Sequence, residues 1–256
     1  MHIFYLLADW QAYRKSIDSS TKIGFVPTMG NLHRGHISLV EAAYQANDIV
    51  VASIFINPTQ FNHPDDFKHY PRTLAQDFKQ LEAAGVEAVI VPDYEALYAD
   101  DYRYQIHETK TSTILEGRHR PGHFNGVLTI VMKLFNLVKP TNAYFGEKDN
   151  QQFQLLKDMA EAFFMDLGVH MCPTVREDSG LAMSSRNNRL TSTQKQEAET
   201  FARCFLQKDK NCDAIKQEME AMGFKVDYVE EHNQRRYAAA YVGEIRLIDT
   251  YECVSS

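Results

Sequence analysis

Two histidines stand three residues apart in a glycine-containing segment of the chain. The segment reads Pro27-Thr28-Met29-Gly30-Asn31-Leu32-His33-Arg34-Gly35-His36. Near the start of a helix, this spacing lets both imidazoles project to the same side. An imidazole donates a hydrogen bond to a phosphate oxygen, and when protonated it adds a charge that suits a leaving pyrophosphate. Taken alone, the segment fits a phosphate-binding corner about as well as it fits two surface histidines behind a buried strand.

Three further polar segments carry groups that suit a nucleotide or a small acid. Next to a nucleotide, the lysine of Gly146-Glu147-Lys148-Asp149 would supply a mobile charge, and its aspartate could orient a ribose hydroxyl or a metal-bound water. Met183-Ser184-Ser185-Arg186 could close over triphosphate oxygens. Gln60 and Gln152 offer donors and acceptors that suit hydroxyl and carboxylate groups. Each segment alone is explained more simply, as a salt-bridged turn, a capped turn or surface glutamines.

Alternating strand-like and helix-like segments precede these polar residues and must position them. Apolar runs predict buried strands at 23–26, 48–56, 87–91, 143–145 and 169–175. Apolar residues at helical spacing predict helices over 37–43, 73–85, 127–138 and 153–163. This order predicts an α/β fold with a Rossmann-like parallel sheet and crossover helices. Ligands bind at the carboxyl ends of the strands in such a sheet, where the N–H groups of helix N-termini face them.

The composition changes after about residue 188. Two polar helices are expected near 191–206 and 213–222, followed by strand-like pieces at 224–229, 237–242 and 245–248. We therefore expect residues 1–177 to form a nucleotide-binding catalytic domain. Residues 178–190 are expected to form a linker and phosphate-closing loop, and residues 191–256 a small C-terminal α+β lid domain.

Composition limits the classes of partner. The chain has 256 residues and 44% apolar content, enough for a substantial core. A formal net charge of −7 argues against a broad nucleic-acid surface, which needs clustered Lys and Arg. The scattered cysteines include no Cys-x-x-Cys pair, so zinc and disulfide frameworks are not expected. The N-terminal apolar run is too short for a signal peptide, and no segment matches a membrane span. These features predict a cytoplasmic protein without membrane or nucleic-acid partners.

Motifs for several other chemistries are absent from the sequence. It contains no Gly-x-Gly-x-x-Gly for a dinucleotide, no P-loop and no Gly-x-Ser-x-Gly hydrolase elbow. His119 and His123 flank a proline and a glycine, so they do not form a helical metal pair.

Five ordered segments together resemble the pantothenate synthetase family, the pantoate–β-alanine ligases of the nucleotidyltransferase superfamily. These segments are 26–36, 53–61 with 70–73, 121–127, 145–152 and 173–187. Residues 237–249 are also similar to the closing strands of the family. The resemblance implies that (R)-pantoate attacks ATP to form a pantoyl adenylate, and that β-alanine then displaces AMP. It further implies a homodimer that uses Mg²⁺ and serves coenzyme A precursor biosynthesis.

The resemblance also implies a role for each matching residue. His36 acts as an acid toward the leaving phosphates, with His33 and Lys148 as its catalytic neighbours. Gln60 and Gln152 hold pantoate, and Gln60 also lies near the β-alanine position. Asp77 is expected near the magnesium ion. The implied ATP contacts are Met29, Gly30, Asn31, Leu32, His33, Arg34, Gly35, His36, Gly146, Glu147, Lys148, Asp149, Val175, Met183, Ser184, Ser185 and Arg186. Apolar residues that could pack the gem-dimethyl group of pantoate, or simply the core, are Pro27, Met29, Val127 and Ile130.

The chain departs from the family pattern at several positions. Asn31 and Arg34 stand where alanine and glutamate are usual, so Arg34 is expected to add a cation near the phosphates. Asn150 replaces an aromatic residue, and Gln76 precedes Asp77 where another acid is common. The region after residue 188 is shorter than usual for the family, which bears on lid closure and dimer packing.

Three other functions remain open from the residues. A cytidylyl- or adenylyltransferase shares the double-histidine corner but gives no reason for Gln60 and Gln152, and it would form a stable nucleotidyl product. A nucleotide-binding regulatory protein would bind ATP without releasing pyrophosphate. A class I aminoacyl-tRNA synthetase fragment is disfavoured by the acidic charge and by the lack of an RNA-binding extension.

Overall fold

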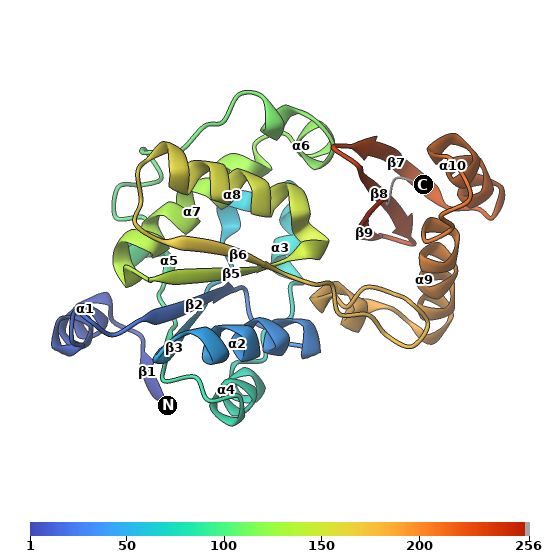
Figure 1. The fold of residues 1–256 in the computed structure, drawn as a ribbon. Helices are drawn as coiled ribbons and strands as arrows, with labels where there is room; N and C mark the ends of the chain where they lie inside the picture. The colour runs from blue at the N-terminus through green and yellow to red at the C-terminus, as the bar shows by residue number, and fades with distance from the viewer. Residues whose placement is uncertain (254–256) are drawn as a thin grey trace.

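The computed structural model describes residues 1–253 and contains two sheets of different kinds. Within these residues, a six-stranded parallel sheet has the order β1-β4-β3-β2-β5-β6, and a three-stranded antiparallel sheet has the order β7-β8-β9 (Figure 1). The strands are β1 His2–Phe4, β2 Ile23–Thr28, β3 Ile49–Ile54, β4 Ala88–Ile90, β5 Asn142–Gly146, β6 Gly168–Cys172, β7 Lys225–His232, β8 Arg235–Val242 and β9 Ile245–Glu252. The predicted α/β fold with a Rossmann-like sheet and a C-terminal α+β part is confirmed.

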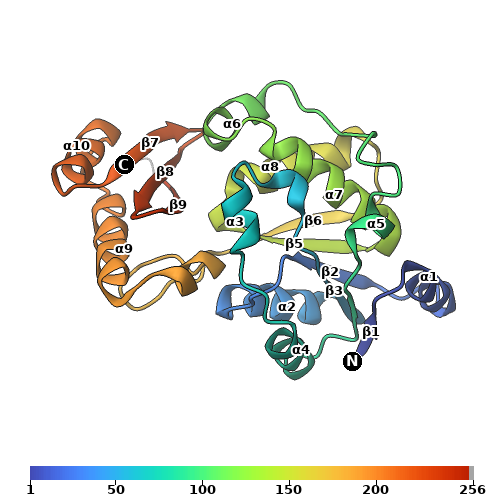
Figure 2. The same ribbon diagram turned by 180° about the vertical axis from the view of Figure 1, so that it is seen from behind.

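Helices cover both faces of the parallel sheet. Seen from the front and from behind, α2 and α4 lie against one face, and α7 and α8 lie against the other (Figures 1 and 2). The α-helices are α1 Leu7–Ser16, α2 Arg34–Ala46, α3 Pro64–Lys68, α4 Leu74–Ala83, α5 Tyr94–Leu97, α6 Glu116–His119, α7 His123–Val138, α8 Asn150–Ala162, α9 Ser192–Phe205 and α10 Cys212–Ala221. The 3₁₀ helices are η1 Pro58–Gln60, η2 Thr111–Thr113, η3 Glu147–Asp149 and η4 Ser185–Arg189. None of the helices in residues 1–253 is long and apolar enough to cross a bilayer.

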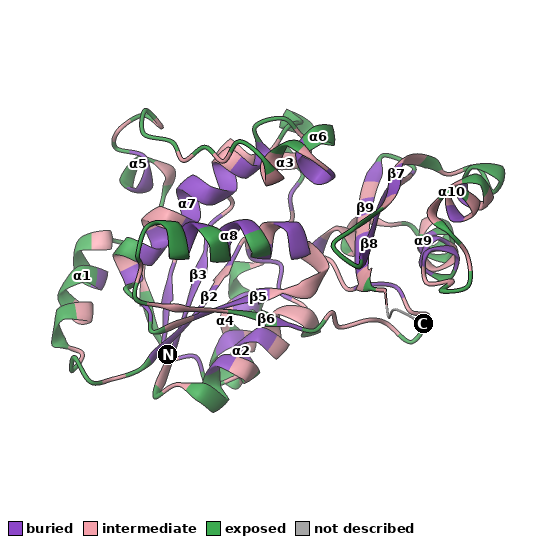
Figure 3. Ribbon diagram, turned by 45° about the horizontal axis from the view of Figure 1, so that its top comes forward, coloured by how far each residue is buried: buried purple, intermediate pink, exposed green. Residues whose placement is uncertain are grey.

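Strand β2 is buried on both of its faces. Successive side chains of a strand point to opposite faces, so Phe25 packs with α7 and α8, whereas Val26 packs with α2. The buried colour of the central strands in Figure 3 shows the same arrangement. Burial on both faces explains why this strand reads as a continuous apolar run and not as an alternating one.

The building direction of the sheet changes at β2. From β2 the chain adds β3 and β4 on one side, and it then returns to add β5 and β6 on the other. Ligands of open α/β sheets bind in the crevice at such a switch point, outside the carboxyl ends of the strands. The loops after β2 and β5 therefore flank the expected binding crevice.

The C-terminal sheet has a hydrophobic cluster of its own. Phe201 and Phe205 of α9 and Ile215 of α10 pack against Ala238 and Ala240 of β8. Polar contacts join this part to the parallel-sheet part, because Glu116 accepts from Tyr228, Glu147 from Arg235, and Asp249 from Arg176. The last three residues of the predicted 191–256 unit lie outside the described residues.

Several predicted boundaries were wrong. Strand β6 ends at Cys172 instead of residue 175, because Pro173 has no N–H to donate to the ladder. The C-terminal strands are longer than expected, because two-residue turns at 233–234 and 243–244 keep the antiparallel pairing continuous. Strand β1 and helix α1 were not expected from the sequence.

Candidate active site

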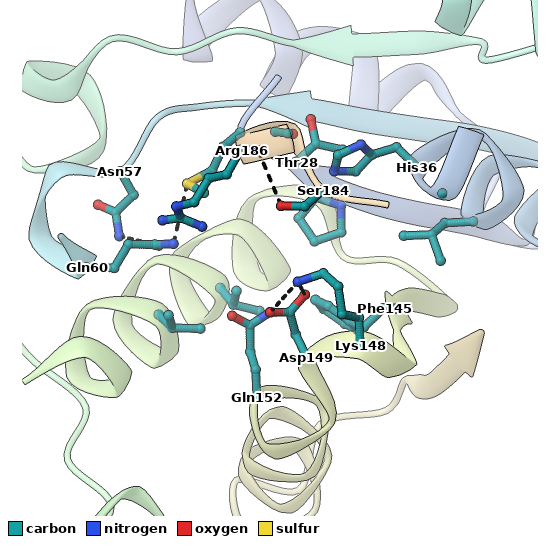
Figure 4. Close-up of a pocket in the computed structure, with 18 of the residues that line it drawn as sticks. Thr28, His36, Asn57, Gln60, Phe145, Lys148, Asp149, Gln152, Ser184 and Arg186 are labelled. Atoms are coloured by element: carbon teal, nitrogen blue, oxygen red, sulfur yellow. Dashed lines mark hydrogen bonds and ion pairs between the residues drawn. The ribbon is translucent and has the colours of Figure 1, made fainter. Parts of the chain in front are cut away.

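A cavity of about 230 Å³ opens beside the carboxyl ends of the central strands. Its wall combines residues that follow β2, β3, β5 and β6, and Figure 4 shows them facing one another. The predicted site residues that line the cavity are Met29, His33, Gly35, His36, Gln60, Gly146, Lys148, Asp149, Gln152, Val175, Met183, Ser184, Ser185 and Arg186. The apolar residues named for the gem-dimethyl group, Pro27, Met29, Val127 and Ile130, line it as well.

The hydrogen bonds of His33 and His36 determine which ring nitrogen carries the proton. His33 is the N-cap of α2, and its Nδ1 accepts the backbone N–H of Gly35 at 3.1 Å. Nδ1 of His36 accepts the backbone N–H of His33 at 3.3 Å, which completes a reciprocal capping box. Because Nδ1 is an acceptor in both rings, each neutral imidazole carries its proton on Nε2. Both rings therefore retain an N–H donor for a ligand.

Burial keeps the two histidines neutral. Desolvation, together with the nearby Lys148 ammonium, lowers the pKa of His33 to about 4. Burial and the neighbouring His33 and Lys148 hold the pKa of His36 well below its usual value. The ring centroids are 4.1 Å apart, so a charge on either ring would also disfavour a charge on the other. As neutral imidazoles, both side chains donate hydrogen bonds without carrying a charge.

Two of the cations that line the cavity, Lys148 and Arg186, are predicted ATP contacts. Nζ of Lys148, on η3, lies 3.1 Å from an Asp149 carboxylate oxygen (Figure 4). The Arg186 guanidinium donates to Asp66 on α3 at 2.8 Å, and Arg189 donates to the same carboxylate at 2.6 Å. Burial alone would raise the pKa of Asp66, but the two arginines lower it. Asp66 therefore fixes the loop that carries the predicted phosphate ligands.

Gln60 is oriented by Asn57, which was not among the predicted site residues. Asn57 donates to the Gln60 side-chain oxygen at 3.0 Å, and Tyr98 donates to Asn57 at 2.8 Å. Among residues 1–253, the sulfur of Met29, at 3.4 Å, is the one partner of the Gln60 amide nitrogen, which therefore keeps donor capacity toward the cavity. Asn57 directly precedes Pro58 in the matched 53–61 segment, and that position at a strand end was the available signal.

Other lining residues were also missed. Those with side chains that could bind a polar ligand include Tyr70, Arg120 and His123. His123 was considered only as half of a metal pair with His119, but the His119 ring stacks on Tyr228 instead. Arg120 and His123 flank Pro121-Gly122, a turn that precedes the long apolar helix at 127–138. Polar residues at such a turn could have indicated that both belong to the site.

Comparison with known proteins identifies the family. The model of the family described as pantoate-beta-alanine ligase matches residues 2–252. The chain belongs to the pantoate–β-alanine ligase family. It is 55% identical to the pantothenate synthetase of Legionella pneumophila (strain Lens), over 98% of this chain and 99% of that protein. It is 54% identical to that of Coxiella burnetii (strain Dugway 5J108-111), over 95% of this chain and 93% of that protein.

Solved structures of the family share the whole fold. The structure of pantoate-beta-alanine ligase from Francisella tularensis, complexed with beta-gamma ATP and beta-alanine, matches with a TM-score of 0.96 and 40% identity, covering 100% of this chain and 99% of that chain. Pantothenate synthetase from Thermus thermophilus matches with a TM-score of 0.91 and 36% identity, covering 99% of each chain. Since the Legionella protein is covered almost end to end, the expected shortening after residue 188 is not seen against that relative.

Some residues that the family resemblance implied as ligand contacts do not line the cavity. They are Gly30, Asn31, Leu32, Arg34 and Glu147. The Arg34 side chain is exposed on α2, so it does not add a cation to the cavity wall. The Glu147 carboxylate is engaged by the Arg235 guanidinium at 2.9 Å and by the Thr174 backbone N–H at 3.1 Å. Glu147 of the ligase therefore supports the site from behind the cavity wall.

Asn31 and Asn150, two residues that differ from the usual family pattern, make hydrogen bonds within the protein. Asn31 donates to the Ser185 carbonyl at 3.0 Å, and Asn188 donates to the Asn31 side-chain oxygen at 3.0 Å. The Asn150 oxygen accepts from the Tyr237 hydroxyl of β8 at 2.7 Å. Asn31 therefore links the turn that leads into His33 and His36 to the loop at 183–188. Asn150 links α8 to the C-terminal sheet.

Asp77 does not fit a metal ligand in this member of the family. The residue is only 1% exposed, and its carboxylate accepts the backbone N–H groups of Asn31 at 3.1 Å and Leu32 at 2.8 Å. The Thr73 hydroxyl also donates to it at 3.1 Å. Within residues 1–253 there is no group of three or more His, Cys, Asp or Glu side chains suited to a metal. The cavity-lining Asp149 carboxylate, 41% exposed, fits Mg²⁺ better, because Mg²⁺ commonly takes one or two carboxylates together with substrate phosphates.

Proposed function

We propose that this pantoate–β-alanine ligase joins (R)-pantoate to β-alanine through a pantoyl adenylate formed in the described cavity. The observation that supports this most directly is the sharing of one cavity by two sets of groups. His33, His36, Lys148 and Arg186 suit the phosphates of ATP, whereas Gln60 and Gln152 suit a small hydroxy acid. Such an arrangement suits in-line transfer between ATP and a bound carboxylate.

In the first step, a pantoate carboxylate oxygen bonds to the α-phosphorus, and the bond from that phosphorus to the bridging oxygen breaks. Pyrophosphate leaves with the bonding electrons. A carboxylate with an ordinary pKa near 4 is already ionised at pH 7, so the nucleophile needs no base. Catalysis of this step then consists of positioning and of stabilising the charge that develops on the leaving oxygens. His36 Nε2–H, His33 Nε2–H and the Lys148 ammonium are the donors that we assign to those oxygens.

In the second step, the β-alanine nitrogen bonds to the acyl carbon and the bond from that carbon to the AMP oxygen breaks. The amine loses a proton, and AMP leaves as the phosphate anion. Gln60 and Gln152 would hold the pantoyl part in place through both steps, so that the acyl carbon does not move between them. When bound, Mg²⁺ would neutralise phosphate charge, with Asp149 as the side chain that could hold it.

We further infer a homodimer that works in the cytoplasm. The four cysteines are free thiols, as a reducing compartment would keep them. Phe163 and Phe164, which follow α8, are 55% and 95% exposed, and a second copy of the chain would cover such apolar surface. Light scattering of the wild type and of Phe164→Asp tests the dimer, and a monomeric wild type would contradict it.

A pyrophosphate-release assay tests the proposed reaction. Pyrophosphate should form from ATP only when pantoate is present, and AMP with the amide product should accumulate once β-alanine is added. Activity with a different carboxylate and none with pantoate would refute the proposal. A stable nucleotidyl product would point to a nucleotidyltransferase instead, and ATP binding without any release of pyrophosphate would point to a regulatory protein.

A further inference from the structure

Arg120 is a largely buried cation on the wall of the cavity, and it has few partners. It follows α6, its side chain is 18% exposed, and it precedes the left-handed Gly122 at the start of α7. One guanidinium nitrogen lies 3.5 Å from the Glu116 carboxylate, and another donates to the Gln60 carbonyl at 3.3 Å. A guanidinium has five N–H donors, so two long contacts leave most of this capacity unused.

The Glu116 carboxylate is already occupied by shorter contacts. Arg246 of β9 donates to both Glu116 oxygens, at 2.7 and 2.8 Å, and the Tyr228 hydroxyl donates at 2.7 Å. Burial alone would raise the pKa of Glu116, but these groups lower it to about 2. Burial outweighs the influence of Glu116 on Arg120, whose pKa is lowered. The Arg120 guanidinium therefore has hydrogen-bond donors to spare for a further anion.

The position of Arg120 indicates which anion it would bind. Arg120 contacts Gln60, whose carbonyl also lies 2.8 Å from Nδ1 of the buried His123. The other cavity cations have different surroundings, because Lys148 acts on the two histidines and Arg186 is held by Asp66. Of these three cations, Arg120 is the one that donates to the Gln60 carbonyl. Arg186 lies close enough to contribute to the lowered pKa of Arg120, but its own guanidinium is paired with Asp66.

We propose that Arg120 binds the carboxylate of β-alanine and so selects an amine that carries a carboxylate. This inference rests on the proposed function. The pantoate carboxylate is the nucleophile, and a tight guanidinium pair would oppose its attack on phosphorus. The β-alanine carboxylate takes no part in bond making, stays ionised throughout and needs a fixed partner when it leaves water. The planar fork of an arginine suits this bidentate contact.

Selectivity between two amines tests the proposal. The rate of amide formation, as kcat/KM, is measured for β-alanine and for propylamine, which has the same chain length but no carboxylate. In Arg120→Gln, the ratio of the two values should fall about 10–100-fold, the worth of a charge-assisted pair. Arg120→Lys keeps the charge without the fork, so an intermediate ratio is expected. The matched control is Arg118→Gln, on the preceding helix α6. The Arg118 side chain is 52% exposed and pairs with Glu230, so this variant should keep the wild-type ratio.

The outcomes separate this proposal from the proposed function. An equal loss with both amines in Arg120→Gln and Arg120→Lys would show that Arg120 only maintains the fold, and an unchanged ratio would show that another group holds the carboxylate. Either result overturns the assignment. Failure of wild-type protein to release pyrophosphate with pantoate would instead overturn the reaction itself. If Arg120→Gln does not fold, the ratio in Arg120→Lys decides, and a wild-type ratio there refutes the proposal.

Discussion

Asp77 holds the backbone of Leu32, and the Asp77 Oδ1 atom lies 2.8 Å from the Leu32 nitrogen. Its second oxygen accepts the N–H of Asn31, which adopts a left-handed φ of 50°. A buried carboxylate thus fixes the turn that leads into His33 and His36. Asp77 was expected near a metal, but it instead fixes the backbone of residues 31 and 32, outside the cavity.

Replacing this carboxylate should destabilise the protein without changing its metal requirement. In Asp77→Asn, an amide NH₂ would face backbone N–H groups, and the lost acceptor should cost about 1–3 kcal/mol of unfolding free energy. Urea unfolding measures the stability, and adenylation over a Mg²⁺ titration measures the metal dependence. Gln76→Ala, at the exposed neighbouring position, is the control. Wild-type stability combined with a much weaker response to Mg²⁺ would restore Asp77 as a metal ligand.

His36 should matter as a donor. Loss of its Nε2–H in His36→Ala should lower the single-turnover rate of adenylation about 10²–10³-fold, as for loss of an oxyanion donor. His36→Gln retains an N–H near the same position and should recover part of the rate. Rapid-quench measurement of pyrophosphate gives both values. An unchanged rate in His36→Ala would remove this residue from the mechanism.

The buried histidines should make stability depend on pH. Burial lowers the pKa of His33 to about 4, that of His123 to about 3, and that of His36 well below 6.5. Between pH 6.5 and about 4, the unfolded chain binds protons at these positions and the folded chain does not. Stability should therefore fall as the pH falls, by up to about 1.4 kcal/mol per pH unit for each histidine. At high pH this contribution is fully present.

One substitution should reduce that slope. His123→Asn removes one of the three titrations, so the slope of unfolding free energy between pH 6 and 5 should fall by about a third. Denaturant unfolding at several pH values measures it. The exposed His63→Asn is the matched control and should keep the wild-type slope. An identical slope in His123→Asn would mean that His123 does not stay neutral in the folded protein.

The Asp66 carboxylate should support ATP binding through Arg186. Asp66→Asn weakens the contacts to Arg186 and Arg189, so the guanidinium of Arg186 becomes free to move away from the cavity. The KM for ATP should rise about threefold to tenfold, the range of a partly exposed ion-pair network. Asp65→Asn, an exposed neighbour on α3, is the control. A lower KM in Asp66→Asn would show that Asp66 competes with the phosphates for Arg186.

Much of the fold could be predicted from the sequence because its signals are local. Apolar runs such as 23–26 and the helical repeat over 127–138 reflect burial of one strand or helix, and β2 and α7 formed there. Strand β1 was not predicted, because its three residues are stabilised by pairing with β4, far away in the sequence. The hairpin pairing that extends β8 and β9 also depends on partner strands.

The sequence by itself determined the order of the strands and helices, the polar residues that follow the strands, and the motif set that marks the ligase family. Those properties are carried by residue types within a few positions of one another. Only the tertiary structure decided which polar groups face the cavity. Asp77 and Lys148 are both charged residues that the family resemblance implied for the site, but Asp77 is buried behind the wall, whereas Lys148 lines the cavity. It also decided that His33 and His36 are neutral Nε2–H donors, because their protonation depends on the bonds and burial that folding creates.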